Sequence, residues 1–188
     1  MKLESLSQCI DFNALDIHGE EFKLSDYRGK AVILSFFRNT SCPLCLKRVF
    51  ELSVHQKKWR EKGVEIIAIF SSSGKNGNRL RKKANTQYRI VIDSELVIYN
   101  KYGVEKSFAG FVKALAFKFP KAVKGLLKGG KIEKNANGTL LPADFLIDAS
   151  GTITESWYGA DASDNIPMDN LVKFVRRMGA ENRNKKSK

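Results

Sequence analysis

The feature that most constrains this chain is a pair of cysteines, Cys42 and Cys45, placed a few residues after the apolar run 31–37. A short apolar run followed by an amphipathic pattern predicts a buried strand that leads into a helix. Pro43 suits the first position of that helix, because the N–H that proline lacks would have no partner there. The amino end of a helix presents unpaired N–H groups and the positive end of the helix dipole, and both stabilise an anion. The pattern therefore predicts a readily ionised thiol, with Cys42 just before the helix and Cys45 in its first turn.

Two thiols at this spacing are sufficient for a redox cycle. A thiolate attacks a disulfide sulfur or a peroxide oxygen, and the second thiol then attacks the first sulfur and closes a ring. Cys42 is the candidate attacking residue because it lies nearest the helix dipole, and Cys45 is the candidate resolving residue. Arg38 is a candidate source of positive charge for the thiolate; a solvent-facing Arg38 is the alternative.

A zinc site is the main alternative use of such a pair. Structural zinc requires four ligands, and only Cys9, His18 and His55 remain as further Cys or His ligands. These three residues have no paired spacing, so we expect no metal and no organic cofactor. Cys9 is interpreted as a passive thiol, and the two histidines as solvated residues.

The rest of the sequence predicts one α/β domain over residues 1–180, because strands and helices alternate in its first half. A closing hairpin makes the expected sheet mixed, and an N-terminal hairpin is expected to turn at His18-Gly19. The tail 181–188 is polar and basic, and is predicted to be disordered. The expected strands are 31–37, 64–70, 90–93, 143–148 and 152–158, and the expected helices run from Cys42 to Gly63, from about 78 to 88, from Leu96 to Tyr102 and from Pro167 onwards.

The positive charge of the chain is concentrated in two segments. Of the formal net charge of +13, residues 106–134 carry +7 and residues 176–188 carry +5. The first lies within an insertion at about 105–138, where apolar residues recur at helical spacing with lysines between them, which predicts two short helices. We interpret it as a lid or buttress whose apolar face packs on the domain. The alternatives are that it covers the thiol site, or that it offers an apolar and basic surface to an acidic partner or a membrane surface. Nucleic acid is not expected as a partner, because no known binding motif is present.

Several features favour a cytoplasmic protein. No stretch approaches the roughly 20 apolar residues of a membrane span. Residues 1–6 contain an early acid and no apolar core, unlike a secretory signal. Three unevenly spaced cysteines are also too few for a secreted domain held together by disulfides.

Three motifs carry a resemblance to known proteins: LSDYRGK at 24–30, FFRNTSCPLC at 36–45 with its Cys-Pro-x-Cys form, and FLIDASGTI at 145–153. At these motifs the chain resembles the thioredoxin-like redoxins, and in particular the peroxiredoxin-like AhpC/TSA group. The resemblance covers roughly residues 10–105 and 139–178. It implies a thioredoxin-like mixed sheet flanked by helices, with the helical insertion before the last hairpin.

The resemblance also has departures that bear on the site residues. Peroxiredoxins carry Pro-x-x-x-Thr-x-x-Cys, and Thr40 misses the required place in both registers, by one position if Cys42 is the last residue and by two positions if Cys45 is. In the peroxiredoxin register Cys45 would be the attacking thiol. Where peroxiredoxins keep an arginine before the last hairpin, this chain has Pro142, which matches the cis-proline beside the cysteines of thioredoxins. The resemblance therefore implies a site of Cys42, Cys45, Arg38, Thr40 and Pro142.

The function implied is that of a thiol-dependent oxidoreductase that reduces peroxides or disulfides and is recharged by a thioredoxin- or glutathione-type reductant. Two alternatives stay open at this point. One is a disulfide reductase without peroxidase activity, which Pro142 favours, and the other is a non-catalytic redox sensor or binding module. The oligomeric state is not predicted.

Overall fold

A five-stranded sheet, in the order β5-β4-β3-β6-β7, forms the centre of the computed structural model, which describes residues 2–40, 42–71, 87–104 and 140–186. Strands β3, β4 and β5 are mutually parallel, whereas β6 runs antiparallel to both β3 and β7. The mixed α/β sheet predicted from the sequence is therefore confirmed. The strands are β3 (Ala31–Phe37), β4 (Val64–Phe70), β5 (Arg89–Ile92), β6 (Ala143–Ile147) and β7 (Ile153–Tyr158).

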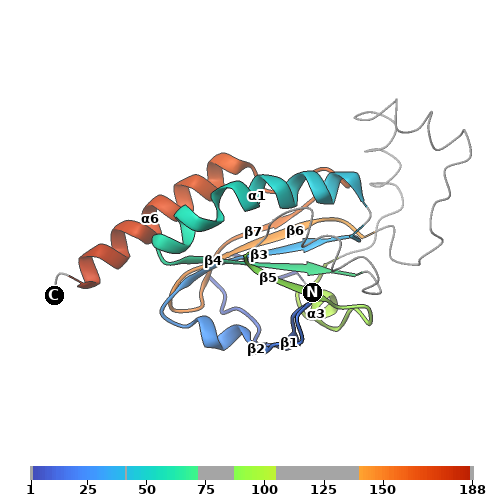
Figure 1. The fold of residues 1–188 in the computed structure, drawn as a ribbon, viewed down its shortest axis with the longest axis horizontal. Coiled ribbons are helices and arrows are strands. Elements are labelled where there is room, and N and C mark those ends of the chain that lie inside the picture. The colour runs from blue at the N-terminus through green and yellow to red at the C-terminus, as the bar shows by residue number, and fades with distance from the viewer. Residues whose placement is uncertain (1, 41, 72–86, 105–139, 187–188) are drawn as a thin grey trace, which may run out of the picture.

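Both faces of the sheet are covered, as Figure 1 shows. Side chains alternate along β3, so that Ile33 and Phe37 belong to one core cluster and Leu34 and Phe36 to the other. Burial on both faces explains why β3 is apolar almost throughout. Helices α1 (Pro43–Glu61) and α6 (Met168–Lys186) cover one face, and the other carries the short strands β1 (Asn13–Leu15) and β2 (Glu21–Lys23), the 3-10 helix η1 (Leu24–Tyr27) and α3 (Val97–Lys101).

The N-terminal hairpin forms as the sequence predicts. Strands β1 and β2 pair antiparallel, and Gly19 in the turn has a φ of +80°, a value that favours glycine. Asp16 accepts hydrogen bonds from the N–H groups of His18 at 2.8 Å and Glu20 at 3.1 Å. The same carboxylate pairs with Arg89 of β5 at 2.5 Å, so the hairpin is tied to the edge of the main sheet.

Helix α6 continues to Lys186. The prediction of a disordered tail over residues 181–188 is therefore wrong for residues 181–186. Buried Met178 anchors the helix on the sheet, and the Asn182 side chain lies against Gly63 at the end of α1. The last two residues lie outside the described part of the chain.

Two predicted segments cannot be compared with the structure. The basic insertion at 105–138 lies outside the described residues, as does nearly all of the basic helix predicted at 78–88. Within the described ranges, no helix combines the length and the apolar character that crossing a membrane requires.

Candidate active site

The cysteine pair lies at the amino end of α1, where the carboxyl end of β3 leads into the helix (Figure 1). Cys42 is the N-cap residue, with extended backbone, and its carbonyl oxygen accepts a hydrogen bond from the Leu46 N–H at 3.0 Å. Pro43 occupies the first helical position and Cys45 lies two residues later, in the first turn. The local structure predicted for the motif is confirmed. Both cysteines are nearly buried, with 7% and 6% of their surface exposed.

Arg38 follows β3 directly and turns back toward the helix. Its side chain is buried, and its Nη2 atom donates a hydrogen bond to the Sγ atom of Cys42 at 2.8 Å. The alternative of a solvent-facing Arg38 is therefore wrong. Because a guanidinium stays protonated at any ordinary pH, its charge favours the thiolate of Cys42 over the thiol.

The two sulfur atoms have opposite tendencies to ionise. The largest influence on Cys42 is a hydrogen bond from the Cys45 side chain; together with the charge of Arg38 it outweighs the opposing effect of burial and lowers the pKa of Cys42 to about 6. The same hydrogen bond, followed by burial, raises the pKa of Cys45 well above its ordinary value. At neutral pH the pair therefore holds one thiolate, on Cys42, and one thiol, on Cys45.

Thr40 and Pro142 lie in the segments that adjoin this pair. Thr40 is buried in the turn between β3 and α1. Pro142 is also buried, directly before β6, and the pairing of Ala143 with Phe36 places it at the same end of the sheet as the cysteines. The described residues contain no cis peptide bond, so the predicted cis bond before Pro142 is wrong. Its carbonyl oxygen accepts a hydrogen bond from the Gly159 N–H at 2.9 Å, which prolongs the pairing of β6 with β7.

Two buried charged residues, one in α1 and one in β6, are functional candidates that the sequence motifs do not reveal. Arg48, one turn beyond Cys45, donates a hydrogen bond to the carbonyl oxygen of Ile166 at 2.6 Å. Asp144 of β6 accepts hydrogen bonds from the Ile166 N–H at 3.0 Å and the Ser35 hydroxyl at 2.6 Å. Burial raises the pKa of Asp144, and the charge of Arg48 opposes this. For Asp144 the sequence does contain a signal, because it is the single acidic residue in the otherwise apolar strand β6.

The remaining cysteine and the two histidines lie apart from this site. Cys9 is half-buried; burial raises its pKa, with the charge of Arg28 opposing. His18 is exposed, and His55 is half-buried with its ring stacked on Trp59 at 5.2 Å. In the part of the chain that the structure describes, no three His, Cys, Asp or Glu residues gather as metal ligands.

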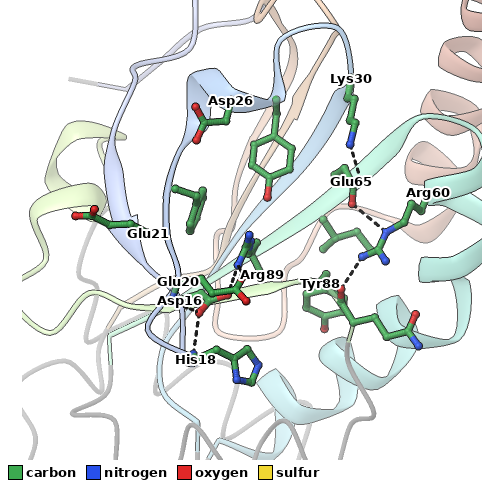
Figure 2. A pocket seen from close by; sticks show the side chains of 14 residues that line it. Asp16, His18, Glu20, Glu21, Asp26, Lys30, Arg60, Glu65, Tyr88 and Arg89 are labelled. Atoms are coloured by element: carbon green, nitrogen blue, oxygen red, sulfur yellow. Dashed lines mark hydrogen bonds and ion pairs between the residues drawn. The ribbon is translucent and has the colours of Figure 1, made fainter.

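A polar cavity of about 560 Å³ lies between the N-terminal hairpin and the β4–β5 side of the sheet (Figure 2). Neither Cys42 nor Cys45 lines it. Its arginines are held in ion pairs, Arg89 with Asp16 and Glu20, and Arg60 with Glu65 at 3.2 Å. The cavity is therefore distinct from the thiol site.

Residues 6–156 match the model of the AhpC/TSA family. The thiol-disulfide oxidoreductase ResA of Bacillus thuringiensis subsp. konkukian is 28% identical over 165 residues, which cover 88% of this chain and 76% of ResA. Peroxiredoxin Bcp of Bacillus subtilis is 24% identical over 166 residues, covering 88% of this chain and 92% of Bcp.

Among solved structures, peroxidoxin BcpB of Mycobacterium tuberculosis superposes with a TM-score of 0.67 at 14% identity. The superposition covers 93% of this chain and 97% of BcpB. The fold is therefore the thioredoxin-like fold that the sequence resemblance implied.

Proposed function

Because the chain belongs to the AhpC/TSA family and is a thiol-dependent oxidoreductase, we propose that Cys42 attacks the substrate and that Cys45 resolves the product. The observation that carries this assignment is the buried contact of 2.8 Å between Arg38 Nη2 and Cys42 Sγ at the amino end of α1. The attacking species is a thiolate, and the contact favours the thiolate on Cys42. Cys45, held as a thiol beside it, is in place for the second step.

Disulfide reduction proceeds in two exchanges. The Cys42 thiolate attacks one sulfur of the substrate disulfide, forms a mixed disulfide and releases the other sulfur as a thiolate. Cys45 then loses its proton, which the released thiolate accepts, and attacks the Cys42 sulfur. The second substrate thiolate leaves, and the Cys42–Cys45 disulfide forms. The substrate gains two electrons and the dithiol loses two.

Peroxide reduction uses the same residues. The Cys42 thiolate attacks the terminal peroxide oxygen, the O–O bond breaks, and the leaving alkoxide or hydroxide takes a proton from the solvent and departs as an alcohol or water, while Cys42 becomes a sulfenic acid. Cys45 then attacks the Cys42 sulfur and water leaves, giving the same disulfide. Arg38 supports both reactions at their first step, because both begin from the Cys42 thiolate. Thr40 and Pro142 complete the proposed site beside the two sulfurs.

We propose disulfides as the better substrate. Thr40 does not occupy the position at which peroxiredoxins orient the peroxide, and the Cys-x-x-Cys spacing suits disulfide exchange. Two electrons are needed to reduce the Cys42–Cys45 disulfide back to the dithiol. The proposal therefore includes a thiol reductant, either a thioredoxin-type dithiol or two molecules of a glutathione-type monothiol, and a reducing, cytoplasmic location. Three cysteines in 188 residues support that location.

Trapping the mixed disulfide tests the assignment of the two cysteines. The experiment uses the full chain carrying Cys9→Ser, with Cys42→Ser or Cys45→Ser added, and a peptide disulfide as substrate. Mass spectrometry should find a peptide adduct on Cys42 in the Cys45→Ser protein and no adduct in the Cys42→Ser protein. An adduct that forms only in the Cys42→Ser protein would reverse the roles.

Turnover assays test the reaction itself. With dithiothreitol as reductant, the Cys9→Ser control should reduce insulin disulfides and, more slowly, consume hydrogen peroxide. Loss of turnover in both cysteine variants is expected. A protein that forms the Cys42–Cys45 bond reversibly and turns over neither substrate would be a redox sensor, and the proposal would fail.

A further inference from the structure

Two hydroxyl groups hold the backbone from which the Arg38 side chain departs. The carbonyl oxygen of Arg38 accepts hydrogen bonds from the Ser71 N–H, at 3.2 Å, and from the Ser71 hydroxyl. The carbonyl oxygen of Phe37, one residue earlier, accepts a hydrogen bond from the Tyr99 hydroxyl. The Tyr99 hydroxyl oxygen also lies 2.9 Å from the carbonyl oxygen of Ile69. The Ser71 hydroxyl forms a hydrogen bond with the Tyr99 hydroxyl as well. The carboxyl ends of β3 and β4 are thus joined at the start of the turn that leads to the cysteines.

Tyr99 is itself held firmly in place. Its side chain is fully buried, and its ring packs edge-on against that of Phe36 with 5.1 Å between centroids. The Asp93 carboxylate accepts hydrogen bonds from three successive N–H groups at the start of α3, the last being that of Tyr99 at 3.1 Å. Burial raises the pKa of Tyr99 well above its ordinary value, and the charge that an ionised Cys45 carries raises it further.

We propose that Tyr99 and Ser71 are positioning residues that act through Arg38. Their hydroxyls fix the main chain of Phe37 and Arg38, and this keeps the guanidinium in contact with the Cys42 sulfur. The inference rests on the proposed function, because it concerns the residue that activates the attacking thiolate.

A short turn joins the Arg38 backbone to Cys42. Only three residues separate Arg38 from Cys42, and within this turn the Cys42 N–H donates to the Asn39 carbonyl oxygen at 3.3 Å. Hydrogen bonds weaken steeply as their distance and angle depart from the optimum, so a small shift of the Arg38 backbone weakens the contact with the sulfur. Without the two hydroxyls, the Phe37 carbonyl loses its bond to Tyr99, and the Arg38 carbonyl loses one of its two bonds to Ser71 and keeps the bond from the N–H. The backbone then resists such a shift less strongly.

The test measures the pKa of the Cys42 thiol. Alkylation of the reduced full chain by iodoacetamide is followed between pH 5 and 9 on a Cys9→Ser background, with mass spectrometry identifying Cys42 as the modified residue. Tyr99→Phe keeps the ring and removes the hydroxyl; Ser71→Ala keeps the backbone N–H and removes the hydroxyl. Tyr102→Phe is the matched control, since Tyr102 is equally buried and its hydroxyl donates to the Ile10 carbonyl oxygen at 2.7 Å instead.

Tyr99→Phe and Ser71→Ala should each raise the Cys42 pKa by about half a unit to one unit, as loss of a charge-stabilising contact does. Tyr102→Phe should leave it unchanged. In an Arg38→Met background, Tyr99→Phe should add no further rise, because the pathway through Arg38 is already broken.

An unchanged pKa in both the Tyr99 and Ser71 variants would overturn the inference, as would an equal rise in the Tyr102 control. A further rise on the Arg38→Met background would show that Tyr99 does not act through Arg38. A pKa of about 8.5 for Cys42 in the starting protein, the value of a free thiol, would instead refute the proposed function.

Discussion

Replacing Arg38 by methionine removes the buried charge beside Cys42 while keeping a long side chain in its place. A hydrogen bond to a charged group contributes about 1.5–3 kcal/mol, and one pKa unit corresponds to about 1.4 kcal/mol. The contact is short, at 2.8 Å, but the Cys45 side chain supplies the larger share of the stabilisation and remains in the variant. We therefore expect the pKa of Cys42 to rise from about 6 by about 1.5 units, to about 7.5.

The rate of alkylation should change in opposite directions at low and high pH. At pH 5.5 the thiolate fraction falls from about 24% to about 1%. Each thiolate of the variant is about fivefold more reactive, because nucleophilicity rises with pKa with a coefficient of about 0.4–0.5. Arg38→Met should therefore react about fivefold more slowly at pH 5.5, at a similar rate near pH 7, and about fivefold faster at pH 9.

The assay is iodoacetamide alkylation of reduced protein on the Cys9→Ser background, since this neutral reagent does not itself respond to the lost charge. The two rate profiles should cross near pH 7. Profiles that differ by one constant factor over the whole range would indicate altered access to Cys42 and would refute the electrostatic reasoning. Identical profiles would show that Arg38 does not stabilise the thiolate.

Two further substitutions test other contacts. Cys45→Ala removes the donor with the largest effect on the Cys42 pKa, whereas Cys45→Ser keeps a hydroxyl that can donate. The alkylation profile should show the Cys42 pKa rising by about one unit or more in the alanine variant. A rise as large in the serine variant would contradict this reasoning. Burial raises the pKa of Asp16, but the hydrogen bonds from Arg89 and two backbone N–H groups outweigh it, so the net pKa is lowered. A lowered pKa gives stability that is present above about pH 3.9 and is lost as the pH falls through the folded-state pKa. Urea unfolding should therefore show Asp16→Asn losing about 1–3 kcal/mol at pH 7 and clearly less at pH 3, whereas equal losses would rule out the charge as the cause.

The features predicted correctly from the sequence are those encoded by neighbouring residues. The run 31–37 is apolar at both even and odd positions, which is the pattern of a strand buried on two faces, and it forms β3. Pro43 lacks a backbone donor, and the first helical position is where that donor is not needed, so the start of α1 could be placed to the residue.

The features missed depend on residues that are distant in the chain. The Tyr99 hydroxyl holds a carbonyl 62 positions earlier, and the Ser71 hydroxyl one 33 positions earlier. No local pattern distinguishes these hydroxyls from those of other buried residues. The direction of the Arg38 side chain cannot be predicted for the same reason, because it depends on how distant residues hold the turn after β3. The helical tail could not be predicted, because its polar composition carries no information about the contact between Asn182 and Gly63.

The pairing of β3 with β6 has a consequence for how the protein is made. Residues 31–37 find their antiparallel neighbour only at 143–147, more than 100 positions later. A ribosome adds about 5–20 residues per second, so both thiols leave the exit tunnel several seconds before the strand that completes their side of the sheet. During synthesis both thiols are therefore exposed before the strand that helps to bury them has been made. Oxidants in the cell can react with Cys42 and Cys45 while the domain is still incomplete.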